Sequence, residues 1–541
     1  MKISLKSRIV SALAVTALAG TVVVGAPTAA NATPQCATAS FVTQCAGVGA
    51  DGAPYLMIAA ANFNGTVLLW SHGVRPAIDI PATLAPVGPY TKTNAAVPGP
   101  LVPADMSVVN KLVAAGYGVA GSGFSRQGIN TTEALAANKE LIATFKTKFP
   151  TTKTVIAWGA SLGAMHSQML AEKHPELVDG VILACPAANP QDALMTYFGD
   201  ALWGFKALFD PTIKVGGYST DPATRVAEQY ANIGKVLTVL SKLSAGLSSG
   251  AWPDTASPAG KALQAAGIPS RSALLTVGLM AGVSTRSKHV DGTSGPTGAA
   301  ETYPLAVAPA VAVLENMGAT LNYGTLMIAD GELLAGGKVY DNTKTDYAAR
   351  VAADADIYSF ALSGNSAVAG IIAALAATPR ETADAAAVAK IPSLVGLSGK
   401  ITKPTIIFQA ESEEFVPSSI VQWYIDSYAE QFAAEKMKAM ADAKKSRSYV
   451  APKNNLVVLW AKTAAKYSKF NGLSPDLTAA PGAGTGHCLF TANQWLAAAN
   501  LMTATLKDGK FPLGGKIATT ARKAGLSYDN KFRVPLFKSL Q

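Results

Sequence analysis

The chain has 541 residues, 49% of them hydrophobic and 15% charged, with a formal net charge of +10. This length exceeds one ordinary domain and predicts two or three, with ample apolar residues for a sizeable core. The charge excess lies at the two ends, in residues 1–32 and 507–541, so the body between them is close to neutral. We therefore expect no nucleic-acid partner.

Residues 1–32 are typical of a secretory signal peptide. Three basic residues precede an apolar run from Ile9 to about Ala26, and Ala30-Asn31-Ala32 supplies small residues for cleavage after Ala32. An uncleaved membrane anchor is the alternative, because the run is nearly long enough to span a bilayer. Its glycines and its small-residue ending favour cleavage, and no later stretch is apolar enough to span. We expect a secreted, extracellular protein with no stable membrane span.

Export makes the four cysteines informative. Cys36 and Cys45 bracket a short segment near the predicted mature N-terminus and are expected to pair. Cys185 and Cys488 remain, either as a second disulfide that would tie a histidine loop to the sheet or as two buried thiols. Both alternatives stay open from the sequence.

The C-terminal segment 507–541 holds eight Lys or Arg residues against two Asp. A basic tail of this kind is attracted to an anionic cell envelope or polymer. We favour the alternative of a solvated terminal extension.

Two strands are predicted first, at 53–60 and 66–70, and the Asn64-Gly65 turn between them favours a hairpin. A Pro-rich loop follows, to about Pro103. Helices and strands then alternate, which predicts an α/β fold with a doubly wound, mostly parallel sheet: helix 106–115, strand 117–121, helix 131–149, strand 154–158, helix 162–173 and strand 180–185.

The alternation stops at about residue 190. From there to residue 400 the chain is Ala-rich with helical periodicity, broken by Gly, Ser and Pro, and we interpret it as a large, mostly helical insertion. A strand resumes at 405–409. The predicted organisation is therefore a signal peptide (1–32), a core in two parts (33–189 and 401–506), the insertion (190–400) and the basic extension (507–541).

Gly159, Ala160, Ser161, Leu162 and Gly163 form a G-x-S-x-G pattern between the strand at 154–158 and the helix at 162–173. A serine on a sharp strand-to-helix turn is how one large class of hydrolases exposes its nucleophile. The turn is strained, so the residues two before and two after must be tiny. The chain contains a second G-x-S-x-G at 246–250, but no strand precedes it, and Ser248 is interpreted as a loop serine.

A serine nucleophile needs a general base, and a carboxylate usually orients that base. Among five histidines, His487 is favoured because glycines flank it and a predicted helix follows. The other four histidines have structural explanations or the wrong place in the chain to be the base: His72, His166, His174 and His289. His72 is nevertheless well placed to shape an oxyanion site. Three carboxylates follow the strand at 405–409 and are candidates for the acid: Glu411, Glu413 and Glu414.

The order serine, acid, histidine resembles the α/β-hydrolase superfamily, and in particular secreted bacterial serine hydrolases with a large lid insertion. That superfamily often carries an Asp three residues before Val-Pro, and Glu413 precedes Val416-Pro417 in this way. The resemblance implies Glu413 as the acid, with Glu414 as runner-up. It also implies an oxyanion hole from the backbone amides of Leu162 and of Gly73 or Val74, and a lid at 190–400.

The expected activity is hydrolysis of a small-molecule or polymeric carboxylic ester through Ser161, His487 and Glu413. One alternative is a serine exopeptidase, which needs a site for a charged terminus; the candidate carboxylates are Glu301, Glu315, Glu332 and Asp341. Another is a non-catalytic binding protein on the same fold. We expect neither a metal nor a cofactor, because the few histidines and cysteines lack ligand spacing and no nucleotide fingerprint occurs.

Overall fold

The computed structural model describes seven segments of the chain: residues 33–100, 106–187, 191–292, 307–446, 448–465, 467–471 and 474–540. The expected signal peptide, residues 1–32, lies outside them.

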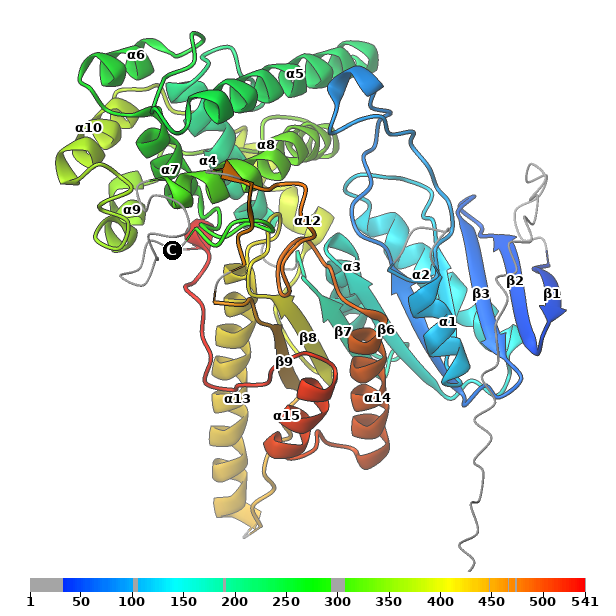
Figure 1. Cartoon of the computed structure of the whole chain (residues 1–541). Coiled ribbons are helices and arrows are strands. Elements are labelled where there is room, and N and C mark those ends of the chain that lie inside the picture. Colours follow the sequence, from blue (N-terminus) through cyan, green and yellow to red (C-terminus); the bar gives the residue numbers. More distant parts are fainter. Residues whose placement is uncertain are drawn as a thin grey trace, which may run out of the picture.

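One twisted sheet of nine strands organises the described residues (Figure 1). Its order is β1-β2-β3-β5-β4-β6-β7-β8-β9. The strands from β5 to β9 in this order run parallel, whereas β1, β2 and β3 add an antiparallel edge. The bounds are β1 Gln35–Ala39, β2 Val42–Val48, β3 Pro54–Ala60, β4 Thr66–Ser71, β5 Gly118–Ser122, β6 Thr154–Ala160, β7 Gly180–Ala184, β8 Thr405–Ala410 and β9 Leu456–Ala461. The expected mostly parallel α/β sheet is confirmed.

Successive side chains of a strand point to opposite faces of the sheet, and both faces are apolar here. Helices cover each face. On β4, Val67 and Leu69 belong to one buried cluster, whereas Leu68 and Trp70 belong to the other. The first cluster includes side chains of α2, α3 and α13, and the second includes those of α1, α14 and α15. These helices are α1 Ser107–Ala114, α2 Thr131–Lys148, α3 Leu162–Lys173, α13 Ser419–Ser446, α14 Ala492–Asp508 and α15 Gly514–Lys523.

Between β7 and β8 the described elements are all helices, as the expected insertion requires. They gather over the edge where the parallel strands end (Figure 1). Their bounds are α4 Gln191–Leu208, α5 Pro222–Gly246, α6 Pro258–Ala265, α7 Ser270–Ala281, α8 Ala308–Ala335, α9 Tyr347–Ala355, α10 Asn365–Ala376, α11 Ala385–Val388 and α12 Ile391–Val395. Two short strands, β10 Phe470–Asn471 and β11 Ser474–Pro475, and two 3₁₀ turns, η1 Ala82–Leu84 and η2 Lys538–Leu540, complete the elements. None of the described helices is both long and apolar enough to cross a bilayer.

The predicted hairpin between β3 and β4 is wrong. Strand β5 lies between these two strands, antiparallel to β3 and parallel to β4. Antiparallel pairs of consecutive strands occur earlier in the chain, where β1 pairs with β2 and β2 pairs with β3. In the first of these hairpins Ser40 and Phe41 turn the chain with positive φ angles of 48° and 67°. Cys36 and Cys45 are directly opposite in this hairpin and form a disulfide.

The expectation of a solvated C-terminal extension is also wrong. After α15 the chain returns to the helical insertion (Figure 1). Phe537 is fully buried there, with its ring 5.4 Å from that of Tyr197. Lys538 donates to the carbonyl of Arg350 at 2.6 Å and pairs with Asp354 at 3.1 Å. The segment is therefore part of the packed structure.

Candidate active site

Ser161 lies at the turn from β6 to α3 with φ 56° and ψ −126°. A positive φ is strained for a serine, as expected for a nucleophile on a sharp strand-to-helix turn. The two flanking glycines are required by contacts. A Cβ on Gly159 would lie 2.3 Å from the carbonyl oxygen of Gly163, and a Cβ on Gly163 would lie 2.0 Å from that of Ser71. The backbone amide of Ser161 donates to Ala184 at 3.0 Å, which fixes the turn against β7.

The Ser161 hydroxyl is buried and makes no hydrogen bond with any described residue. Leu162 begins α3, so its backbone amide has no acceptor within the helix and lies at the positive end of the helix dipole. A Cβ on Gly73 would lie 3.3 Å from the Cβ of Ser161, and Val74 lines the same pocket as the serine. The structure therefore brings the three expected oxyanion residues around Ser161.

His487 and Glu413 form the second half of the site. Nδ1 of His487 lies 2.7 Å from Oε1 of Glu413, whose side chain is fully buried, whereas that of His487 is 25% exposed. The same Glu413 oxygen accepts from the backbone amides of Phe415 and Val416, at 3.0 and 3.3 Å, and the other accepts from Cys488 at 3.4 Å. These donors fix the direction of the carboxylate.

The neighbouring carboxylates have other partners. Glu414 pairs with Lys288 of the insertion at 3.3 Å. Glu411 accepts from the backbone and hydroxyl of Thr463, both at 2.9 Å. Of the three candidates from the sequence, Glu413 is therefore the one that contacts the histidine.

A disulfide between Cys185 and Cys488 ties the histidine loop to the end of β7, the strand that pairs with the serine strand β6. Cys185 directly follows the residue whose carbonyl accepts from Ser161. The ring of Phe415 lies 5.2 Å from the ring of His487 and also lines the pocket of Ser161. No hydrogen bond joins the Ser161 hydroxyl to His487 among the described residues.

The electrostatics of the pair favour a basic imidazole. Burial alone would lower the pKa of His487, but the charge of Glu413, the hydrogen bond to it and the charge of Glu414 together outweigh burial. The net effect is a pKa above the ordinary value of about 6.5. Glu413 thus orients the ring and stabilises its protonated form.

The other histidines lie elsewhere. Burial, followed by the charge of Arg75, lowers the pKa of His72 to about 3, so its imidazole is neutral between the carbonyls of Gly73 and Gly123. His166 is fully buried on α3, His174 follows that helix, and His289 contacts Glu315 through a short hydrogen bond within the insertion. Ser248 follows helix α5 rather than a strand, and it lines a cavity different from that of Ser161.

The four side chains of Cys185, Glu413, His487 and Cys488 place potential metal-ligating atoms within 4.8 Å of one another. The two sulfurs are joined in the disulfide, so they lack the thiolates that bind metals. The cluster is therefore explained by the disulfide and the imidazole–carboxylate pair.

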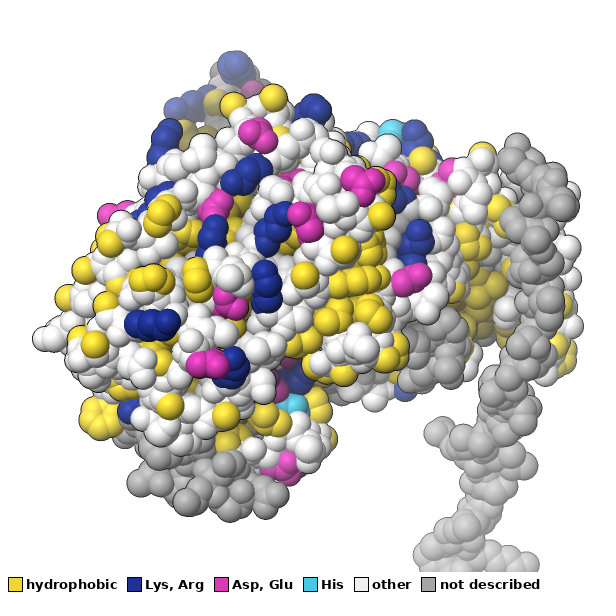
Figure 2. Space-filling model, turned by 90° about the horizontal axis from the view of Figure 1, so that it is seen from above, with side chains coloured by type: hydrophobic (Ala, Val, Ile, Leu, Met, Phe, Trp, Pro, Cys, Tyr) yellow, Lys and Arg dark blue, Asp and Glu magenta, His cyan; other side chains and the backbone are white. Residues whose placement is uncertain are grey.

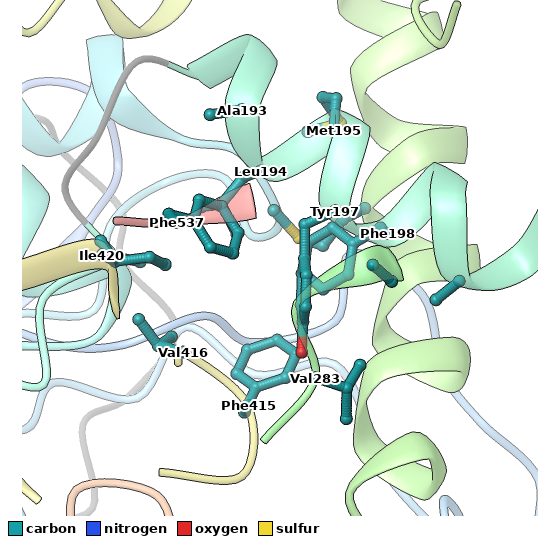
Figure 3. Close-up of a cluster of buried hydrophobic side chains, with 14 of the residues drawn as sticks. Ala193, Leu194, Met195, Tyr197, Phe198, Val283, Phe415, Val416, Ile420 and Phe537 are labelled. Atoms are coloured by element: carbon teal, nitrogen blue, oxygen red, sulfur yellow. The ribbon is translucent and has the colours of Figure 1, made fainter. Parts of the chain in front are cut away.

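Apolar side chains close over Ser161. Leu194, Met195 and Phe198 of α4 and Met327 of α8 meet the segment at 415–416, leaving a cavity of about 20 Å³, room for about one water molecule. Figure 3 shows the part of this packing formed by α4 and the segment at 415–416, with Tyr197 and Phe537 beside it. The sequence did not reveal these lining residues, because no motif marks them in an Ala-rich helical stretch.

A family model described as alpha/beta hydrolase fold matches residues 117–215, which run from β5 through the serine turn into the helical insertion. No curated protein matches the sequence significantly.

Among solved structures, the chain is similar to feruloyl esterase B from Aspergillus oryzae, with 13% identity, 88% of this chain and 83% of that chain covered, and a TM-score of 0.41. It is also similar to the rice cell wall degrading esterase LipA from Xanthomonas oryzae, with 12% identity, coverages of 77% and 81%, and a TM-score of 0.29. The sheet order, the strained serine turn and the matched segment identify an α/β-hydrolase fold.

Proposed function

We propose that this protein is a secreted serine hydrolase that cleaves carboxylic esters through an acyl-enzyme. The observation that carries the proposal is the Ser161 hydroxyl, unpartnered on a positive-φ turn, at the same sheet edge as the His487–Glu413 pair. A strained turn and a buried hydroxyl without a partner both cost stability. Their coincidence with an oriented base supports a nucleophile.

In the proposed mechanism, Ser161 Oγ attacks the ester carbonyl carbon while Nε2 of His487 takes the hydroxyl proton. Backbone amides of Leu162 and of Gly73 or Val74 hold the oxyanion. When the intermediate collapses, the C–O bond breaks and His487 returns the proton to the leaving alcohol. Water, deprotonated by the same imidazole, then releases the acid and restores the serine.

The lining of the pocket favours an ester over a peptide with a free amino terminus. The described residues around Ser161 include no carboxylate, which an ammonium group would need. The candidate carboxylates are engaged elsewhere: Glu315 with His289, Glu332 with the amides of Gly217 and Tyr218, and Asp341 with Thr343 and Ala383. Glu301 lies outside the described residues.

A non-catalytic binding protein has no need for a strained serine, so the turn geometry argues against this alternative. Secretion is supported by the sequence of the N-terminal segment and by the two disulfides, which persist mainly in oxidising compartments. Contact with an anionic cell envelope through the C-terminal segment remains a proposal of lower priority, because Lys538 of this segment already has intramolecular partners.

The test is hydrolysis of 4-nitrophenyl acetate and butyrate, compared with aminoacyl and peptidyl 4-nitroanilides. We expect the wild type to hydrolyse the esters and Ser161→Ala to lose that activity to the background rate. Ser248→Ala, which removes the serine of the second G-x-S-x-G pattern, should behave as wild type. Equal activity of wild type and Ser161→Ala would contradict the proposal, and faster cleavage of the anilides would favour the peptidase.

A further inference from the structure

A second cavity, here called the cationic cavity, adjoins the apolar pocket of Ser161. Its volume is about 350 Å³, and Val74 and Met327 line both spaces. It lies between the loop that follows β4 and the helices α5 and α8 of the insertion. The two cavities therefore share part of their walls.

The charges that line the cavity are strongly unequal. Among its described lining residues, Asp330 is the one carboxylate. The four cationic side chains are Arg75, Lys92, Arg126 and Arg225. On the outer face seen in Figure 2, by contrast, basic and acidic side chains are interspersed. The cavity therefore differs from the ordinary surface of the protein.

Two of the four cations are compensated by carboxylates. Asp330 accepts from both terminal nitrogens of Arg126 and from the backbone amide of Ile129 at 2.7 Å. The charges of Asp330 and Arg126 therefore neutralise each other. Arg225 donates to a backbone carbonyl of α8 at 2.6 Å and interacts electrostatically with Glu332.

Arg75 is not compensated. Its Nη1 donates to the carbonyls of Ala95 and Thr93, at 3.0 and 3.4 Å, and none of the described carboxylates pairs with it. Its Nε and Nη2 donors form no hydrogen bond with any described residue. Burial lowers the pKa of Arg75, the direction expected for a cation removed from water without a counter-ion. Lys92, exposed at the rim, also lacks an ion pair among the described residues.

We propose that Arg75, assisted by Lys92, binds a carboxylate group of the substrate, so that the substrate is an ester carrying an anionic group away from the scissile bond. This inference rests on the proposed ester hydrolase. The Nε and Nη2 donors form the planar edge of a guanidinium that matches both oxygens of a carboxylate. The two bonds of Nη1 to the loop carbonyls hold this edge in place, which reduces the entropy lost on binding.

The test compares esters in which one member of each pair carries a free carboxylate and the other carries its uncharged methyl ester. On the acid side the pair is monomethyl adipate and dimethyl adipate; on the alcohol side it is 4-acetoxybutanoate and its methyl ester. We expect wild type to prefer the anionic member of at least one pair in kcat/KM. Arg75→Gln should reduce the anionic-to-neutral ratio of kcat/KM at least tenfold, the size expected for a lost hydrogen bond to a charged group. Arg75→Lys should reduce it less.

Two further variants keep the test decisive. Lys92→Gln changes an exposed side chain that forms no ion pair with the described residues, and it should also lower the anionic-to-neutral ratio. This variant therefore tests the proposal even if Arg75→Gln fails to fold. Lys111→Gln removes one exposed positive charge from α1 and should leave the ratio unchanged. A wild-type ratio of one or less in both pairs, or a ratio that Arg75→Gln and Lys92→Gln leave unchanged, would overturn the proposal.

Calorimetry separates this proposal from the proposed function. Adipate should bind to the wild type more tightly than adipamide, and Lys92→Gln and Arg75→Gln should weaken adipate binding. Such binding without any ester hydrolysis would support the anion site and contradict the hydrolase. Ester hydrolysis with equal binding of adipate and adipamide would overturn the anion site alone.

Discussion

Replacing Glu413 by Gln tests the contact on which the proposed base depends. The substitution keeps the size of a fully buried side chain but removes the charge that lies 2.7 Å from Nδ1 of His487. Glu414→Gln is the matched control, because the adjacent carboxylate pairs with Lys288 instead. Each variant removes one negative charge, and the two positions are adjacent in the chain.

The magnitude follows from the charged hydrogen bond. Such a bond contributes about 1.5–3 kcal/mol, and about 1.4 kcal/mol corresponds to tenfold in rate. We therefore expect kcat/KM of Glu413→Gln to fall by about 10- to 100-fold from loss of the charge alone. An amide that turned its NH₂ group toward Nδ1 would select the wrong tautomer and deepen the loss. Glu414→Gln should fall less than about threefold, as expected for a more distant charge.

The pH profile of activity tests the direction in which Glu413 shifts the pKa of His487. Neutral His487 is the base, and Glu413 raises its pKa, so activity of the wild type should be lost as the pH falls through a value above about 6.5. Without the carboxylate, burial dominates and lowers the pKa, so the acid limb of Glu413→Gln should move to lower pH. The assay is kcat/KM for 4-nitrophenyl butyrate from pH 4.5 to 9, with thermal unfolding as a check of the fold. An unmoved acid limb, or a greater loss in Glu414→Gln, would refute the reasoning.

Three further substitutions test the surrounding structure. Gly163→Ala places a Cβ 2.0 Å from a backbone carbonyl oxygen of β4, so it should abolish esterase activity and lower the midpoint of thermal unfolding. Replacing Cys185 and Cys488 by Ser opens a loop with a sequence separation of 303 and should destabilise the protein by about 2–5 kcal/mol; unchanged chemical denaturation would contradict this. Phe537→Ala removes a fully buried ring and should cost about 3–5 kcal/mol, whereas Leu513→Ala, at an 87% exposed side chain, should leave the unfolding midpoint unchanged.

Local signals in the sequence predicted the centre of the site. The glycines around Ser161 are required by contacts within the turn and with the neighbouring β4 strand, so a five-residue pattern carries much of the geometry. The alternation of strands and helices gave the fold class because parallel strands need crossover helices. The order of the serine, acid and histidine followed from the resemblance to a known superfamily.

The predictions from the sequence that were wrong concern contacts between segments distant in the chain. The Asn64-Gly65 signal is local, and it could not report that β5 inserts between β3 and β4. The C-terminal segment looks solvated by charge, but Phe537 anchors it in the insertion. Arg75 has no sequence motif, because its lack of a counter-ion is a property of the assembled cavity.

The account's central claim is that Ser161 is an activated nucleophile. The direct measurement is labelling of the folded protein with a fluorophosphonate probe, followed by peptide mass spectrometry to locate the adduct. We predict one adduct, on Ser161, retained in Ser248→Ala and absent in both Ser161→Ala and His487→Ala. An adduct on another serine, or no adduct on folded wild-type protein, would contradict the claim.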